Sequence, residues 1–301
     1  MIVYKDGAWQ GLEETSIPVM DHGFLYGVGL FETFRTYQGS PFLFQDHLKR
    51  LREGLSSVYI EWEEDDDSLL QMIGTALEKN NLIDGVLRLN VTAGISNWGL
   101  PNETYTRPST LLFTRPVTPV HDEGRRAVFL QIPRNTPEGS VRLKSHHYLN
   151  NLLGKRELGN LADTEGIFLT REGYVSEGIV SNIFWVKNNT LYTPSISTGI
   201  LNGVTRQYVI HLARLLGVKV EEGTFTKEEL LHSEEVFLTN STQEMVRINQ
   251  VDEVEFPKAG RHSLFERLRE LYKESTYRQL QSYQQAKRVD VQNGKDKLIS
   301  E

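Results

Sequence analysis

Lys144 has the clearest capacity for covalent chemistry in this sequence. It follows a turn-rich run at 134–139 and precedes apolar residues at helical spacing, namely Tyr148, Leu149, Leu152 and Leu153. A lysine near the start of a helix experiences the positive end of the helix dipole and partial desolvation, and both effects lower its pKa. The pattern therefore predicts an amine that could form a Schiff base, although most lysines beside a helix only extend along it into solvent.

A second group of residues could bind an anion such as a phosphate. Gly203 would allow an anion to approach the backbone closely, and Thr205 is a cap or first-turn residue of a predicted helix. Unpaired amides at a helix start bind phosphates well. The Thr-Asn-Ser-Thr loop at 239–242 could add hydroxyl donors, and Arg50 could add a guanidinium. Each feature also has a simpler explanation: an ordinary helix start, a plain turn and a solvated arginine.

The elements that must position these residues mix helices and strands. In the first part of the chain we expect a hairpin around residues 5–7, helices at 46–59 and 65–82, and strands at 30–35, 86–92 and 110–114. Alternation along the strand at 30–35 places Phe31, Thr33 and Arg35 on one face, and Glu32 and Phe34 on the other.

The second part of the chain repeats this α+β mixture. We expect strands at 127–132, 166–170, 174–186, 190–194 and 234–238, and helices after Lys144, from Thr205 and from 264 to about 284. Prolines and charges around 116–126 mark a boundary. The sequence thus predicts a small N-terminal domain at 1–118, a larger C-terminal domain at 119–285 that carries Lys144, and a flexible tail at 286–301.

Composition excludes several classes of function. Hydrophobic residues make up 39% of the 301 residues and charged residues 24%, which suits a globular protein with a sizeable core. The net charge of −7 argues against nucleic acid or an acidic membrane as a partner. Without cysteine there are no disulfides, thiolate nucleophiles or cysteine-bound metals, and no metal-spaced histidine set is present. With no signal-peptide pattern or spanning segment at the start, a cytoplasmic enzyme that acts on a small molecule is expected.

Taken in order, these motifs resemble those of a known family. Their order is similar to that in the fold-type IV pyridoxal-phosphate enzymes. The motifs are a lysine before a helix, a strand glutamate in Ser176-Glu177-Gly178, a Gly-Val-Thr helix start and a Ser-Thr loop. This group contains branched-chain and D-amino acid aminotransferases and aminodeoxychorismate lyases. The resemblance covers about residues 2–275. It implies a two-domain D-amino acid aminotransferase-like architecture, an active site between the domains, pyridoxal 5'-phosphate as cofactor, and a homodimer.

The same resemblance implies roles for individual residues. Lys144 corresponds to the lysine that forms a Schiff base with the cofactor, and Glu177 to the carboxylate that pairs with the pyridine nitrogen. Leu201 corresponds to the residue packed beneath the cofactor ring. The residues that correspond to the phosphate ligands are Arg50, Val204, Thr205, Ser241 and Thr242.

Departures from the family pattern narrow the expected activity. The D-amino acid aminotransferases have a tyrosine in place of Phe31, and an arginine and a histidine in place of Trp98 and Leu100, so their carboxylate trap is missing here. The motifs at 21–27, 31–35 and 142–151 are most similar to aminodeoxychorismate lyases.

That similarity implies cleavage of 4-amino-4-deoxychorismate to 4-aminobenzoate and pyruvate in folate biosynthesis. Thr33 is then a candidate acid for the departing enolpyruvate, and Phe31, Arg35 and Arg107 are candidate substrate contacts. A branched-chain or D-amino acid aminotransferase is the alternative, and a non-catalytic module that binds a phosphorylated ligand is the alternative of another class.

Overall fold

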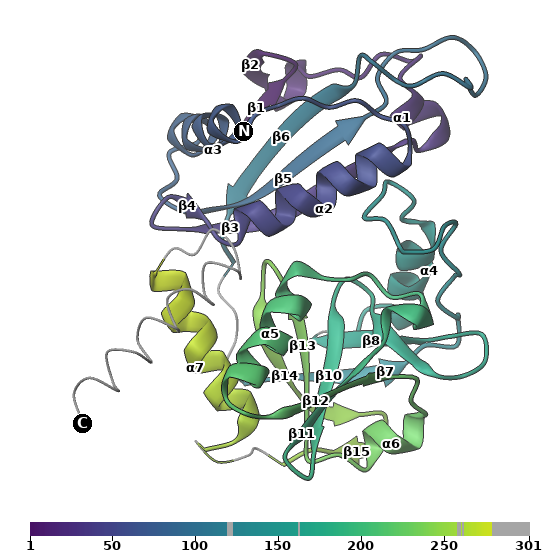
Figure 1. Cartoon of the computed structure of the whole chain (residues 1–301), viewed down its shortest axis with the longest axis vertical. Coiled ribbons are helices and arrows are strands. Elements are labelled where there is room, and N and C mark those ends of the chain that lie inside the picture. Colours follow the sequence, from purple (N-terminus) through teal and green to yellow (C-terminus); the bar gives the residue numbers. More distant parts are fainter. Residues whose placement is uncertain (119–122, 162, 258–259, 261, 279–301) are drawn as a thin grey trace. The chain divides into compact units, whose positions relative to one another are not determined.

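The computed structural model describes residues 1–118, 123–161, 163–257, 260 and 262–278 (Figure 1). The chain forms two compact units. The first contains Met1–Thr118, Lys144–His147 and the chain from Ser275 onward, and the second contains Pro119–Leu143 and Tyr148–Glu274. Both units combine helices with sheet, which confirms the α+β class. The predicted tail at 286–301 lies outside the described residues.

The first unit contains a six-stranded antiparallel sheet in the order β2-β1-β6-β5-β3-β4. Its strands are β1 (Ile2–Lys5), β2 (Ala8–Gly11), β3 (Gly29–Tyr37), β4 (Ser40–Pro41), β5 (Gly85–Thr92) and β6 (Ser109–Pro116). The hairpin predicted around 5–7 and the three predicted strands are confirmed.

Three helices accompany this sheet: α1 (His22–Tyr26), α2 (Phe44–Ser57) and α3 (Asp66–Lys79). Figure 1 shows α2 running along the sheet, and its buried leucines Leu48, Leu51 and Leu55 explain the helical period of the sequence. Asp65 caps α3 by accepting a hydrogen bond from the Ser68 amide. Both predicted helices are therefore confirmed, with ends shifted by a few residues.

The second unit contains a nine-stranded mixed sheet in the order β12-β11-β10-β13-β14-β7-β8-β9, with β15 paired to β14. Its strands are β7 (Arg125–Phe129), β8 (Thr164–Leu169), β9 (Val175–Gly178), β10 (Asn182–Lys187), β11 (Thr190–Pro194), β12 (Lys219–Gly223), β13 (Glu235–Asn240), β14 (Glu244–Val251) and β15 (Val254–Glu255). Its helices are α4 (Leu149–Leu158), α5 (Val204–Leu215) and α6 (Lys227–Leu231), and α7 (Leu264–Tyr277) begins in it.

The continuous strand predicted at 174–186 is wrong. It is divided into β9 and β10 by a turn in which the Gly178 amide donates to the Ser181 carbonyl at 2.8 Å. β9 pairs with β8 and β10 with β11, both antiparallel as expected. The division matters because it places Glu177 near the end of one strand and Asn182 at the start of the next.

The prediction that Lys144 opens a helix is also wrong. α4 begins only at Leu149, and Ser145 forms an isolated antiparallel bridge with Leu30 of β3. The Phe31 amide donates to the Lys144 carbonyl at 2.9 Å, and the His146 amide donates to the Gly29 carbonyl at 3.0 Å. Pairing with a distant strand thus replaces the local helix, and the helix-dipole argument for this lysine does not apply.

The buried side of α4 differs from the predicted one as well. Leu149 is 68% exposed, and Leu152 and Leu153 are also exposed. The helix instead buries Asn151, Gly154 and Leu158. A Cβ atom at Gly154 would lie only 2.6 Å from the Phe168 ring, so this glycine allows α4 to pack directly on β8. Among the described residues, no helix is long and apolar enough to cross a membrane.

Candidate active site

The aromatic ring of Phe31 is the centre of one group of reactive side chains. Phe31 is buried in β3, and Lys144 Nζ lies 4.7 Å from its ring centroid. The guanidinium carbon of Arg88 lies 3.6 Å from the same centroid, and the His146 ring is stacked at 6.1 Å. A lysine amine, a guanidinium and an imidazole therefore share one aromatic platform in the first unit.

The strand register explains why these side chains meet. In the antiparallel pair of β3 and β5, Phe31 lies opposite Asn90 and Thr33 lies opposite Arg88. Directly opposed residues project from the same face of a sheet, so Thr33 and Arg88 share a face with Phe31. The predicted alternation is confirmed by the other face, where Glu32 and Phe34 contact residues of α2.

Arg50, a predicted phosphate ligand, is bound to the buried carboxylate of Glu32. Its Nε donates to Oε1 and its Nη2 donates to Oε2, both at 2.7 Å. His47 Nδ1 lies 2.7 Å from Oε2 of the same carboxylate. Burial alone raises the pKa of Glu32, but Arg50 and His47 outweigh it and lower the pKa to about 2. Glu32 thereby fixes Arg50 on α2.

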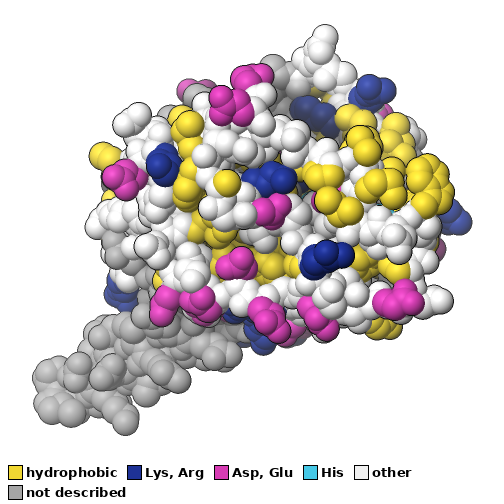
Figure 2. Space-filling view, turned by 90° about the horizontal axis from the view of Figure 1, so that it is seen from above, with side chains coloured by type: hydrophobic (Ala, Val, Ile, Leu, Met, Phe, Trp, Pro, Cys, Tyr) yellow, Lys and Arg dark blue, Asp and Glu magenta, His cyan; other side chains and the backbone are white. Residues whose placement is uncertain are grey.

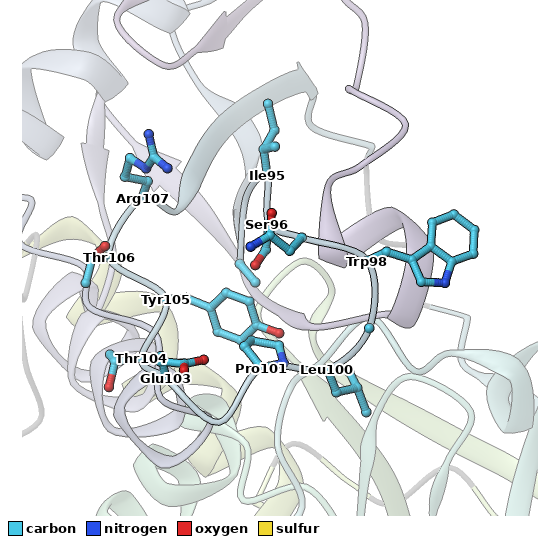
Figure 3. A pocket seen from close by; sticks show the side chains of 13 residues that line it. Ile95, Ser96, Trp98, Leu100, Pro101, Glu103, Thr104, Tyr105, Thr106 and Arg107 are labelled. Carbon is cyan, nitrogen blue, oxygen red and sulfur yellow. The ribbon is translucent and has the colours of Figure 1, made fainter.

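The predicted substrate contacts Arg35 and Arg107 lie at two further places in the first unit. The Arg35 guanidinium stacks on Tyr37, 4.6 Å from its centroid. Arg107 lines a cavity of about 490 Å³ within the loop between β5 and β6. Figure 3 shows Arg107 and Trp98 on opposite sides of this cavity, with the Tyr105 ring between them. His22 holds the loop in place, because its Nδ1 lies 2.9 Å from the Tyr105 hydroxyl and its Nε2 lies 2.9 Å from the Asn97 carbonyl.

In the second unit, Glu177 lies in a dense network of hydrogen bonds. Arg134 Nε donates to its Oε1 at 2.8 Å, and the Leu201 amide donates to its Oε2 at 2.9 Å. Asn182 Nδ2 lies 3.5 Å from Oε2 and donates to the Leu201 carbonyl at 2.8 Å. Arg142 Nε lies 3.7 Å from Oε1. Glu177 is therefore held as a rigid, charge-paired carboxylate beside Leu201.

The two arginines beside Glu177 affect each other. Burial, and then the neighbouring charge of Arg134, lower the pKa of Arg142 to about 10, while Glu177 acts in the opposite direction. At neutral pH the Arg142 guanidinium therefore still carries its charge. This part of the site therefore combines one carboxylate with two cations.

Two of the segments predicted to bind an anion meet at the start of α5. Gly203 is the N-cap residue and gives no side-chain capping bond, while Val204 and Thr205 form the buried first turn. The Thr205 hydroxyl lies 3.2 Å from the Ser241 hydroxyl, so the predicted helix start and the predicted loop meet. Thr242 belongs to a turn closed by Asn240, whose Oδ1 accepts from the Thr242 amide at 3.0 Å.

Several residues of these networks were missed in the sequence, namely Arg88, Arg134, Arg142, His146 and Asn182. Arg88 could have been recognised in the sequence, because it is a charged residue within the mostly apolar strand Val-Leu-Arg-Leu-Asn-Val. Arg134 and Arg142 lie in a turn-rich stretch in which arginines are usually solvated, so nothing local connected them with Glu177.

Comparison with known proteins identifies the family. Residues 29–251 match the model of the amino-transferase class IV family. The chain is 44% identical over 261 residues to aminodeoxychorismate lyase of Bacillus subtilis (strain 168), covering 85% of this chain and 88% of that protein.

Solved structures agree with this assignment. The branched-chain aminotransferase of Thermoproteus uzoniensis with norvaline superposes with a TM-score of 0.84 and 26% identity, over 94% of this chain and 97% of that one. The branched-chain amino acid aminotransferase of Thermobaculum terrenum in its PLP form gives a TM-score of 0.80 and 25% identity, over 93% and 94%. The chain therefore belongs to the class IV aminotransferase family and has the fold-type IV architecture.

Proposed function

We propose that the protein is a pyridoxal-phosphate-dependent lyase that converts 4-amino-4-deoxychorismate to 4-aminobenzoate and pyruvate, a reaction of folate biosynthesis. The observation that carries the proposal is the 44% identity to a lyase over most of both chains. The absence of the D-amino acid aminotransferase carboxylate trap at Trp98 and Leu100 argues against that one aminotransferase activity. An aminotransferase is the second candidate, because the two superposed structures described above are branched-chain aminotransferases.

The residues of the second unit fit pyridoxal phosphate by their chemistry. A phosphate calls for hydroxyls and backbone amides, which Thr205, Ser241, Thr242 and the α5 start at Val204 could supply. The protonated pyridine nitrogen calls for a carboxylate, which Glu177 supplies, and Leu201 would pack against the ring. Arg50 of the first unit is the proposed arginine of the phosphate set, with its guanidinium fixed by Glu32.

The cofactor, when bound through Lys144, would withdraw electrons from the substrate carbon that carries the amine. Once the substrate amine has displaced the Lys144 amine from the cofactor, the freed Lys144 would act as the base that removes the proton from this carbon. The bond from the neighbouring carbon to the enolpyruvyl oxygen breaks, and the ring becomes aromatic, which drives the elimination forward. Thr33, on the same strand face as Phe31, is the proposed donor that protonates the enolpyruvate on its way to pyruvate.

We further propose that the protein acts as a homodimer. Large hydrophobic side chains are exposed in the first unit: Trp98 is 82% exposed, Leu100 70% and Phe24 68%. Figure 2 shows hydrophobic side chains gathered on part of one face. An apolar surface of this kind is typical of a protein interface, and sedimentation measurements of the purified protein should give a dimer.

Product identity tests the lyase assignment. The protein should be offered 4-amino-4-deoxychorismate alone, D-alanine with 2-oxoglutarate, and leucine with 2-oxoglutarate. The lyase forms 4-aminobenzoate without an oxo acid, because the substrate amine leaves with the product. A strict requirement for 2-oxoglutarate would instead establish a transaminase.

The role of Lys144 is tested separately from the substrate. The purified holoenzyme should be yellow, and borohydride reduction followed by peptide mapping should label Lys144. Lys144→Ala should abolish turnover, whereas Thr33→Ala should slow it without loss of colour. A colourless protein that takes up no pyridoxal phosphate would favour a non-catalytic binding module.

A further inference from the structure

We propose that Arg142 weakens the interaction between Glu177 and the protonated pyridine nitrogen of the cofactor, and so limits how strongly the ring withdraws electrons. The inference rests on the proposed function, because it takes Glu177 as the partner of that nitrogen. Arg142 acts on the nitrogen through its charge and through Glu177, so it is a positioning residue of this reaction.

The contacts of Arg142 place its charge beside a carboxylate that is already paired. Its side chain is only 9% exposed, and its Nε lies 3.7 Å from Glu177 Oε1, the oxygen that accepts from Arg134 Nε at 2.8 Å. The shorter hydrogen bonds of Arg142 go to neutral oxygens. Its Nε donates to the Gly199 carbonyl at 2.5 Å, its Nη1 donates to Asn135 Oδ1 at 3.2 Å, and its Nη2 donates to the Asn135 carbonyl. Neutral acceptors therefore fix this guanidinium, while its charge lies next to Glu177.

The charges of this cluster do not balance. Two guanidinium groups share the one carboxylate of Glu177, which leaves a positive charge in excess. Burial and then repulsion by Arg134 lower the pKa of Arg142 to about 10, whereas Glu177 and then Glu138 act in the opposite direction. Glu138 is exposed, so water and salt screen its charge. A further cation that binds at Glu177 therefore meets repulsion as well as attraction.

A protonated pyridine nitrogen is a cation of this kind. A nitrogen that donates to either oxygen of Glu177 lies about 3 Å from it, and therefore within about 9 Å of Arg142 Nε. At an effective dielectric constant of about 20, two like charges at this distance disfavour the protonated state by roughly tenfold. Glu177 and Arg142 thus act in opposite directions on one proton, and the electron withdrawal by the ring depends on their balance.

Arg142→Met removes the charge and retains an unbranched side chain. The apo-protein should be titrated by absorbance with pyridoxal phosphate and with 1-deazapyridoxal phosphate, in which a carbon replaces the pyridine nitrogen. The ratio of the two Kd values isolates the nitrogen, because the lost contacts to Asn135 and Gly199 affect both ligands alike. We expect the preference for pyridoxal phosphate over the deaza compound to increase roughly tenfold in Arg142→Met. Arg142→Lys, which keeps the charge, should retain the wild-type ratio.

Arg247→Met is the matched control. The Arg247 side chain is also 9% exposed, but its Nη2 donates to Glu266 Oε1 at 2.7 Å, so its charge is compensated. This variant should keep the wild-type ratio. A purely structural role of Arg142 would weaken the binding of both ligands equally, and an unchanged or smaller preference in Arg142→Met would overturn the inference.

Failure of the proposed function gives a different result. It appears as absence of 4-aminobenzoate formation by a wild-type protein that still binds pyridoxal phosphate, and the ratio of Kd values then still tests Arg142. A wild-type protein that binds neither pyridoxal phosphate nor the deaza compound would overturn both the proposed function and the inference.

Discussion

Phe31 and Lys144 are joined through both backbone and side chain. The Phe31 amide donates to the Lys144 carbonyl at 2.9 Å, and Lys144 Nζ lies 4.7 Å from the Phe31 ring centroid. The backbone bond continues the sheet, since β3 is paired on its other edge with β5. A strand therefore positions the backbone of Lys144, and the amine of this lysine lies over the aromatic ring of Phe31.

Replacing Phe31 tests this arrangement. Phe31→Leu keeps an apolar residue in the buried position but removes the aromatic surface under Lys144 and Arg88. Stability should fall by no more than about 1.5 kcal/mol, whereas kcat should fall. Phe31→Ala should also lower kcat, and its total cost in unfolding free energy should be larger, about 3–5 kcal/mol, because it leaves a cavity. Urea unfolding and steady-state kinetics check both results, and a Phe31→Leu protein with wild-type kcat would show that the ring does not position the amine.

Glu177→Gln tests the carboxylate held by Arg134 and Leu201. The amide can still accept hydrogen bonds but no longer favours a protonated pyridine nitrogen. We expect the variant to retain pyridoxal phosphate, to lose about 1–3 kcal/mol of stability, and to lose at least about tenfold in kcat. Absorbance titration, urea unfolding and kinetics measure these quantities.

The control for this variant is Glu165→Gln in β8. Burial raises the pKa of Glu165, and this residue accepts a hydrogen bond from the Ile179 amide at 3.0 Å. The change to an uncharged amide should therefore cost little stability and leave kcat unchanged. Equal kinetic effects of the two substitutions would argue against a cofactor contact for Glu177.

Local patterns predicted those parts of the fold in which local and tertiary preferences agree. The alternation at 30–35 identified the face of Phe31 and Thr33, because one face of β3 packs on α2. The start of α5 was predictable because Gly203 and Thr205 have the chemistry of a helix start.

The remaining features depend on contacts between distant residues. The helical period after Lys144 could not reveal that residues 144–146 pair with β3, since strand pairing depends on a partner far away in sequence. In the same way, Arg134 meets Glu177 only when a loop and β9 are brought together. The family resemblance indicated Lys144 and Glu177, but the hydrogen-bond networks around them join residues that are far apart in the sequence.

The buried cluster of Glu32, His47 and Arg50 predicts a dependence of stability on pH. The folded-state pKa of Glu32 is lowered from 4.5 to about 2, so the unfolded chain binds its proton first. The stabilisation is thus complete above pH 4.5 and is lost as the pH falls toward 2. Its size is on the order of 3 kcal/mol. Urea unfolding between pH 7 and pH 3 should show the gap between wild type and Glu32→Gln narrowing as the pH falls below 4.5.

Glu53→Gln provides the control for this titration. Glu53 lies on the same helix α2, and its exposed carboxylate is 3.9 Å from Lys49. Exposed pairs of this kind contribute little, so the variant should follow the wild type at each pH. A gap between wild type and Glu32→Gln that stays constant down to pH 3 would contradict the role of Glu32.

Gly203→Ala tests the proposed phosphate site without removing a polar group. A Cβ atom at this position would lie 2.2 Å from Asn182 Oδ1, so Asn182 must move. Asn182 donates to the Leu201 carbonyl, and the Leu201 amide donates to Glu177. The displacement would therefore disturb both the start of α5 and the Glu177 carboxylate, which is the proposed partner of the pyridine nitrogen.

The pyridoxal phosphate Kd of Gly203→Ala should rise roughly 10- to 100-fold, the equivalent of about 1–3 kcal/mol of overpacking. Absorbance titration of the apo-protein measures this value, and thermal unfolding of the apo-protein separates it from general destabilisation. Gly74→Ala is the matched control, because a Cβ at Gly74 on α3 meets nothing within 4 Å. This control should keep the wild-type Kd and gain about 0.5–1 kcal/mol of stability from the higher helix propensity of alanine. Equal Kd values for the two variants would show that the start of α5 does not bind the phosphate.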